Sequence, residues 1–321
     1  MAVNRDKPDL WKPDNAQSVD MYNDWFMRFA PQAFRETRIR TSLEVVNTLL
    51  ATANLIHVEP RVLRQDPGVL ATLRMCCCPP LARDRLIGLA DVPKSMVNRM
   101  ESGKRLPLLL KGPDLDEELR KIGSIIERMA DRDIFPWLVT HQAPTPTELQ
   151  RAASIVADRL CGAATNPIIR NAQESRQLAR LGDWLQGRGY QFLQSGAGVR
   201  FGEMPPGTYA FHLNIPGRLQ DHSDETVNIP VDAVIMRMAA KTGNLPLLIE
   251  AKSAGDYANV NKRRKEEATK VQQLRRAHGP GVEYILFLCG YFDSGYLGYA
   301  AAEGTDWVWE HRIDDLLQFG A

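Results

Sequence analysis

Apolar and polar residues follow a helical period in the first half of the chain. Apolar positions recur at helical spacing, and proline-rich stretches such as residues 142–147 separate the periodic segments. This spacing predicts helices over residues 18–30, 42–53, 81–90, 93–100, 116–130 and 146–160. We place a domain boundary near Pro144, so that residues 1–144 form a mostly helical N-terminal region.

The second half contains short apolar runs that predict buried strands. Residues 228–236 and 247–252 form two such runs on either side of a glycine-containing turn, and residues 282–290 form a third. A polar, helix-like stretch over residues 256–278 separates the last two runs, and this order of strand, helix and strand predicts parallel neighbours. We therefore predict an α/β core over residues 145–321, with a central mixed sheet flanked by helices.

Two of these predicted strands carry charged residues among apolar ones. Asp232 lies in the first strand, while Glu250 and Lys252 in the second are two residues apart and therefore share a face. Buried charges are tolerated mainly when they are paired or bind a metal. Two carboxylates suit Mg²⁺, and a nearby ammonium suits the charge that develops during phosphodiester hydrolysis. The alternative is a simple salt bridge at a strand edge, because an Asp at free spacing from Glu-x-Lys is a common pattern.

Further candidates lie on a predicted helix over residues 166–186, which Pro167 would open in its first turn. A helix beside the sheet edge could bring Glu174 to the metal as a third carboxylate and Arg170 or Arg176 to a phosphate. The alternative is that Glu174 pairs with one of these arginines on a solvated helix face.

Positive charge is concentrated locally, although the net charge of the chain is only +1. Residues 251–278 contain eight Lys or Arg and three Asp or Glu. A basic helix directly after the candidate strand would place cations along a nucleic-acid backbone. The cations that open this helix are Lys262, Arg263, Arg264 and Lys265. The alternative is a solvated helix, in which Glu266 and Glu267 partly cancel these charges through i,i+4 pairs.

Residues 82–105 could form a helix-turn-helix. Residues 61–111 around them contain ten Lys or Arg and four Asp or Glu, which favours a surface that faces DNA. The side chains predicted to contact DNA are Lys94, Ser95, Asn98 and Arg99, followed by Lys104 and Arg105. The small core beneath them would consist of Leu86, Ile87, Ala90, Val92, Val97 and Met100. The alternative is two packed helices with solvated charges.

Several long phrases resemble the XamI/SalI family of type II restriction endonucleases. They cover residues 19–31, 166–178, 229–235, 248–256, 261–270 and 302–316, so the resemblance extends over nearly the whole chain. It implies a PD-(D/E)xK nuclease core, dependence on Mg²⁺, and a homodimer that cleaves duplex DNA at the palindrome GTCGAC. It also implies a cognate DNA methyltransferase as a functional, not physical, partner. The chain departs from the core motif at Val231, which separates Pro230 from Asp232.

The resemblance suggests a role for each candidate residue. Asp232, Glu250 and the carbonyl of Ala251 would hold Mg²⁺, and Lys252 would lie beside the attacking water. Two alternatives from other classes have distinct consequences. A helix-turn-helix regulator with a non-catalytic nuclease-like core would bind DNA without metal and tolerate Lys252→Ala. A structure-selective repair nuclease would cut ends, flaps or mismatches in place of an intact palindrome.

Composition fits a folded protein with one large or two packed domains. The chain has 321 residues, of which 44% are hydrophobic and 25% charged. No apolar run approaches the roughly 20 residues that span a bilayer, and the polar start lacks a signal-peptide segment. We therefore expect a cytoplasmic protein without a membrane partner. The five cysteines match neither a disulfide framework nor a zinc site.

Overall fold

The structure is a computed structural model that describes residues 2–194, 199–219, 226–241 and 243–321, without the side chains of residues 258–265. It has two compact units, one formed by Met1–Phe29 with Arg170–Ala321 and the other by Ala30–Ile169. This division differs from the boundary predicted near Pro144. The reason is that the two longest helices, α1 (Pro8–Ala51) and α8 (Pro146–Gln186), each contribute residues to both units.

A proline lies inside each of these long helices, close to the division between the units. Pro31 lies within α1 and Pro167 within α8. The predicted start of a helix at Pro167 is therefore wrong, as is the prediction of two separate helices over residues 18–30 and 42–53. Proline lacks the N–H that bonds to the preceding turn, so it usually marks a helix start. Both helices nevertheless continue through their prolines.

The first unit contains a six-stranded sheet in the order β1 to β6. The strands are β1 (Gln191–Phe192), β2 (Thr208–Arg218), β3 (Thr226–Met236), β4 (Leu247–Ala254), β5 (Tyr284–Gly290) and β6 (Asp306–Trp309). β1 is parallel to β2, the pairs β2–β3 and β3–β4 are antiparallel, and the pairs β4–β5 and β5–β6 are parallel. This confirms the predicted α/β class, the mixed sheet and the parallel pair around residues 250 and 286.

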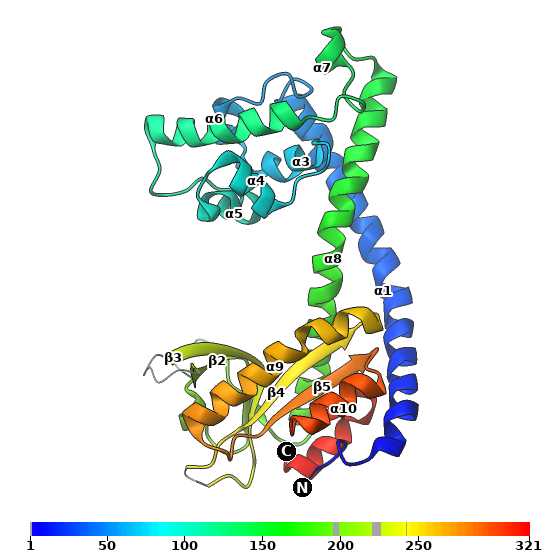
Figure 1. The fold of residues 1–321 in the computed structure, drawn as a ribbon, viewed down its shortest axis with the longest axis vertical. Coiled ribbons are helices and arrows are strands. Elements are labelled where there is room, and N and C mark those ends of the chain that lie inside the picture. The colour runs from blue at the N-terminus through cyan, green and yellow to red at the C-terminus, as the bar shows by residue number, and fades with distance from the viewer. Residues whose placement is uncertain (1, 195–198, 220–225, 242) are drawn as a thin grey trace. The chain divides into compact units, whose positions relative to one another are not determined.

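Helices cover both faces of the sheet. α9 (Tyr257–His278) follows β4, α10 (Ser294–Ala302) follows β5, and both lie against one face (Figure 1). On that face, Val271 and Leu274 of α9 pack with Leu248 and Leu286 of the sheet. The last part of α8 and the helical segment η3 (Glu310–Phe319) cover the other face through a second apolar cluster. All seven residues of β5 are buried, as expected for a strand that is covered on both sides.

The second unit is helical, as predicted for this part of the chain. Between its segments of α1 and α8 it contains α2 (Pro60–Gln65), η1 (Pro67–Val69), α3 (Leu70–Met75), α4 (Arg83–Ala90), α5 (Lys94–Gly103), α6 (Gly112–Met129) and α7 (Trp137–Thr140). A short helical turn, η2 (Phe201–Glu203), belongs to the first unit. All five cysteines are free thiols. Among the described residues, no helix is both long enough and apolar enough to cross a membrane.

Candidate active site

The regular alternation of side chains in β2 and β3 changes at His212 and Asp232. These two residues lie opposite each other, between the pairs Phe211↔Ala233 and Leu213↔Val231. His212 has a φ of 53°, a left-handed conformation that is uncommon for a residue other than glycine. The residues of β2 on the α9 side of the sheet are Ala210, Leu213 and Ile215, and those of β3 are Ile229, Val231, Val234 and Met236. In both strands the alternation between the two faces of the sheet therefore shifts by one residue at this pair. Strained backbone of the kind seen at His212 is often found at functional sites.

Asp232 lies next to the strand that carries Glu250. Ala233 pairs with Ile249, and the backbone N–H of Ala251 donates a hydrogen bond to Oδ2 of Asp232 at 2.8 Å. Burial and the negative charge of Glu250 raise the pKa of Asp232 to about 6, against the opposing effect of this hydrogen bond. A cation between the two carboxylates would relieve their repulsion, so the pair is suited to binding one.

Glu250 and Lys252 share the face that α9 covers, as their spacing predicts. Nζ of Lys252 lies 3.2 Å from Oε1 of Glu250, and Nζ of Lys270 lies 2.8 Å from the same oxygen. The other oxygen, Oε2, is buried and has no hydrogen-bond partner among the described residues. Because an unpaired buried carboxylate oxygen is unfavourable, this atom is an available ligand for a metal ion.

The side chain of Lys252 is held by a second carboxylate that the sequence did not suggest. Glu267 of α9 is buried, and its Oε1 lies 3.1 Å from Nζ of Lys252. Burial lowers the pKa of Lys252, but the attraction of Glu267 and Glu250 outweighs it and leaves this pKa above its ordinary value. Lys252 is therefore a protonated cation. The alternative of a solvated helix face does not hold for Glu267, and its spacing of four and seven residues from Val271 and Leu274 was a signal that it faces the core.

A third group of ligand atoms adjoins Asp232. A carboxylate oxygen of Glu174, a ring nitrogen of His212 and a carboxylate oxygen of Asp232 all lie within 4.8 Å of one another. Nδ1 of His212 is 3.7 Å from Oε1 of Glu174. The structure thus places Glu174 beside Asp232, as its position on a helix at the sheet edge suggested. His212 carried no signal in the sequence, because only the pairing of β2 with β3 brings it to this position.

The two candidate arginines of α8 have different environments. Nη2 of Arg176 lies 2.9 Å from Oε2 of the buried Glu310, and its guanidinium stacks over Trp25 at 5.1 Å. The charge of Arg176 is thus paired with an internal carboxylate, and its phosphate contact stays a prediction. Arg170 is exposed.

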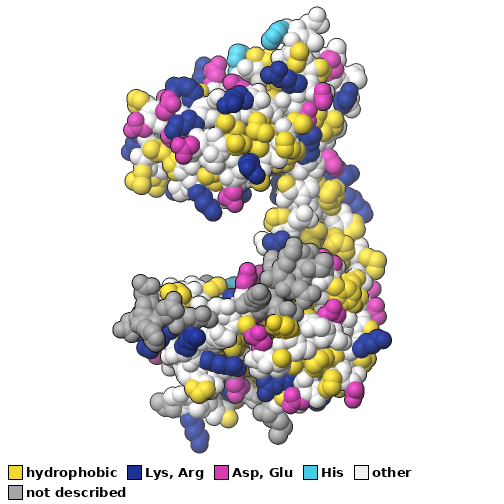
Figure 2. Space-filling model, viewed as in Figure 1, with side chains coloured by type: hydrophobic (Ala, Val, Ile, Leu, Met, Phe, Trp, Pro, Cys, Tyr) yellow, Lys and Arg dark blue, Asp and Glu magenta, His cyan; other side chains and the backbone are white. Residues whose placement is uncertain are grey.

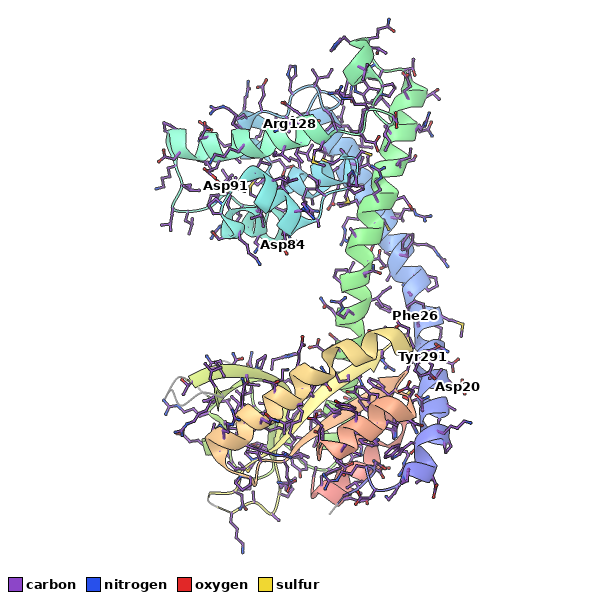
Figure 3. The ribbon with its side chains drawn as sticks, in the orientation of Figure 1. Asp20, Phe26, Asp84, Asp91, Arg128 and Tyr291 are labelled. Atoms are coloured by element: carbon purple, nitrogen blue, oxygen red, sulfur yellow. The ribbon has the colours of Figure 1, made fainter. Side chains whose placement is uncertain are left out.

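The predicted helix pair over residues 82–105 is present as α4 and α5. Asp84 lies in the first turn of α4, and Asp91 follows its last residue (Figure 3). Lys94 and Ser95 are exposed at the start of α5, whereas Asn98 and Arg99 are partly buried. The cations Lys104 and Arg105 are exposed after it. The side chains of Lys262, Arg263, Arg264 and Lys265 lie outside the described residues.

The cluster has the properties of a site for phosphodiester hydrolysis. Asp232 and Glu250 supply carboxylate oxygens, one of which has no partner among the described residues, and Lys252 supplies a fixed positive charge beside them. This combination binds a hard divalent cation and stabilises an anionic phosphorus centre. Fold and site together indicate a nuclease of the α/β class.

Comparisons with known proteins agree with this indication. The model of the XamI restriction endonuclease family matches residues 53–309. The chain is 50% identical over 319 residues to "Type II restriction enzyme SalI" from Streptomyces albus G, which covers 99% of this chain and 100% of the relative. No solved structure matches. The chain belongs to the XamI restriction endonuclease family and is a site-specific deoxyribonuclease, which overturns the alternative of a non-catalytic regulator.

Proposed function

We propose that this chain is a type II restriction endonuclease that cuts both strands of duplex DNA at the palindrome GTCGAC. The observation that carries this proposal is the 50% identity to the SalI enzyme over nearly the whole length of both chains. A cognate DNA methyltransferase is its proposed functional partner, because unmodified host sites would otherwise be cleaved. A cytoplasmic location stays a prediction.

A PD-(D/E)xK core with Mg²⁺ fits the residues that are present. Asp232 lies on β3, while Glu250 and Lys252 lie on the neighbouring β4. Oxygen ligands from Asp232, Glu250 and the carbonyl of Ala251 match the preference of Mg²⁺. Two observations support this set, namely the unpartnered Oε2 of Glu250 among the described residues and the raised pKa of Asp232. When bound, the metal ion would polarise the phosphate and lower the pKa of a water molecule.

The protein side chains have separate roles in this proposal. Lys252, held as a cation, would orient the attacking water and stabilise the additional negative charge on the phosphate oxygens. Glu174 and His212 would assist from the other side of Asp232. Hydrolysis forms a bond from water to phosphorus and breaks the bond to the leaving oxygen, which takes a proton.

DNA recognition is proposed for the helix pair α4–α5. Lys94 and Ser95 are exposed at the first turn of α5, a position from which side chains can reach base edges or phosphates. The proposed DNA-contacting residues are Lys94, Ser95, Asn98, Arg99, Lys104, Arg105, Arg170 and the cations Lys262, Arg263, Arg264 and Lys265. Arg170 is the exposed one of the two arginines considered on α8.

A homodimer is proposed because a two-fold symmetric enzyme matches a palindromic site. An apolar stripe on α1 supports it: Ile39, Leu43, Val46 and Leu50 recur at coiled-coil spacing and are 68%, 63%, 46% and 73% exposed. Hydrophobic side chains are visible along α1 in Figure 2. Two residues of the stripe, Val46 and Leu50, also line a groove of about 420 Å³, together with residues of α8 that include Leu149. The stripe of one copy could pack into the groove of the other.

The test is a digest of plasmids with and without a single GTCGAC site, in Mg²⁺ or EDTA. Lys252→Ala is compared with Lys241→Ala, which changes an exposed lysine between β3 and β4. We expect the wild type and Lys241→Ala to linearise only the plasmid with the site, and only with metal. Metal-dependent cutting elsewhere would remove the proposed target. Cleavage by Lys252→Ala at the wild-type rate would remove Lys252 from the reaction.

A further inference from the structure

Glu267 connects the candidate catalytic lysine to the helical layer. It lies on α9, is 8% exposed, and directs Oε1 to Nζ of Lys252 at 3.1 Å. Its second oxygen, Oε2, accepts a hydrogen bond of 2.7 Å from the hydroxyl of Tyr296 on α10. Tyr296 is itself buried. Both oxygens of Glu267 are therefore fixed by side chains from two other elements, which gives the carboxylate one defined orientation.

Glu267 gives Lys252 a second carboxylate partner. Lys252 and Lys270 both contact Oε1 of Glu250, so two ammonium groups share one carboxylate oxygen. Glu267 supplies the second negative charge. Without it, the ammonium of Lys252 would have only the carboxylate of Glu250 among its described ion-pair partners. The free oxygen of that carboxylate, Oε2, is the atom that our proposal gives to the metal ion.

We propose that Glu267 is a positioning residue for the cleavage reaction. It holds the ammonium of Lys252 away from Oε2 of Glu250, and Tyr296 holds Glu267 in turn. This inference rests on the proposed function, because it takes Lys252 and Glu250 as members of the reaction site. Glu267 contacts neither substrate nor metal in this arrangement, and it acts only through Lys252.

Glu267→Gln keeps the size of the side chain and removes its charge. The ammonium of Lys252 then moves toward Oε2 of Glu250. A displacement of about 1 Å lowers the rate of the catalysed reaction by roughly 100-fold. We expect a loss of this size in kcat with KM for DNA unchanged. Glu267→Asp restores the charge and should recover part of the rate. The matched control is Glu266→Gln, which removes the charge of the exposed neighbour on the same helix.

Tyr296 tests whether the effect passes through Glu267. Tyr296→Phe should lower kcat less than Glu267→Gln, because the carboxylate keeps its charge and its contact with Lys252. The double variant should be no slower than Glu267→Gln alone, since two residues that act through one contact are not additive. Two additive losses would overturn the proposed chain from Tyr296 to Lys252.

A second readout is the binding of Mn²⁺ alone, followed by electron paramagnetic resonance without DNA. We expect weaker binding to Glu267→Gln than to Glu266→Gln, because Lys252 then competes for Oε2 of Glu250. Wild-type kcat and wild-type Mn²⁺ affinity in Glu267→Gln would overturn the inference. If that variant does not fold, a kcat of Glu267→Asp and Tyr296→Phe equal to that of the wild type would also overturn it. Full activity of Lys252→Ala would instead overturn the underlying site assignment.

Discussion

Replacing Asp232 by Asn should stabilise the folded protein at neutral pH when no divalent metal is present. Burial and the neighbouring charge of Glu250 raise the pKa of Asp232 from 3.8 to about 6. A raised pKa means that the folded state binds the proton more tightly than the unfolded state, so ionisation destabilises the fold. Asparagine removes this ionisation and still offers an oxygen to the N–H of Ala251.

The expected magnitude follows from the two pKa values. The difference between 3.8 and about 6, at 1.36 kcal/mol per pH unit, corresponds to about 3 kcal/mol. The penalty is absent below about pH 4, grows as the pH rises toward 6 and is complete above it. We therefore expect Asp232→Asn to exceed the wild type by about 1 to 3 kcal/mol at pH 8, since relaxation around the charge reduces the full value. The gain should be smaller at pH 5.

Urea unfolding in EDTA at pH 5, 6 and 8 measures this difference. Asp133→Asn is the control, because Asp133 is an exposed carboxylate of the other unit. Added Mg²⁺ should stabilise the wild type and leave Asp232→Asn unchanged, since a ligand that binds only the folded state raises its stability. The reasoning is refuted if Asp232→Asn is less stable than the wild type at pH 8, or if the difference does not change with pH.

Two further predictions concern the metal ligands and the dimer. His212→Ala and Glu174→Gln should each weaken Mn²⁺ binding in titration calorimetry, and unchanged affinities would show that these two residues are not metal ligands. The Mn²⁺ affinity of the wild type should also fall as the pH drops through about 6, where Asp232 takes up its proton. Leu43→Glu with Leu50→Glu should give a monomer in sedimentation velocity, because the stripe on α1 would then carry charge; a dimer that persists would place the interface elsewhere.

The sequence predicted the parts of the site that depend on local geometry. Residues two apart on a strand share a face, so Glu250 and Lys252 could be placed together without knowledge of any other strand. The long polar stretch between two apolar runs likewise predicted the parallel pair of β4 and β5. The family phrases were recognisable for the same reason, because they are continuous in the chain.

Helix prediction failed where packing outweighed local preference. Pro167 normally marks a helix start, but α8 continues through it, and the same holds for Pro31 in α1. The missing backbone hydrogen bond is a local cost, whereas the burial of apolar residues along both helices is a gain spread over the whole fold. The sequence showed the local cost alone.

The sequence by itself indicated the class of fold, the strands β3, β4 and β5, and the candidate set of Asp232, Glu250 and Lys252. Only the tertiary structure decided which other side chains join them. His212 reaches Asp232 through the register of two strands, and Glu267 reaches Lys252 because α9 packs on the sheet. Such contacts join residues that are far apart in the chain, so local periodicity does not predict them. They depend on strand register and helix packing, which are set by the burial of whole faces of the sheet and helices.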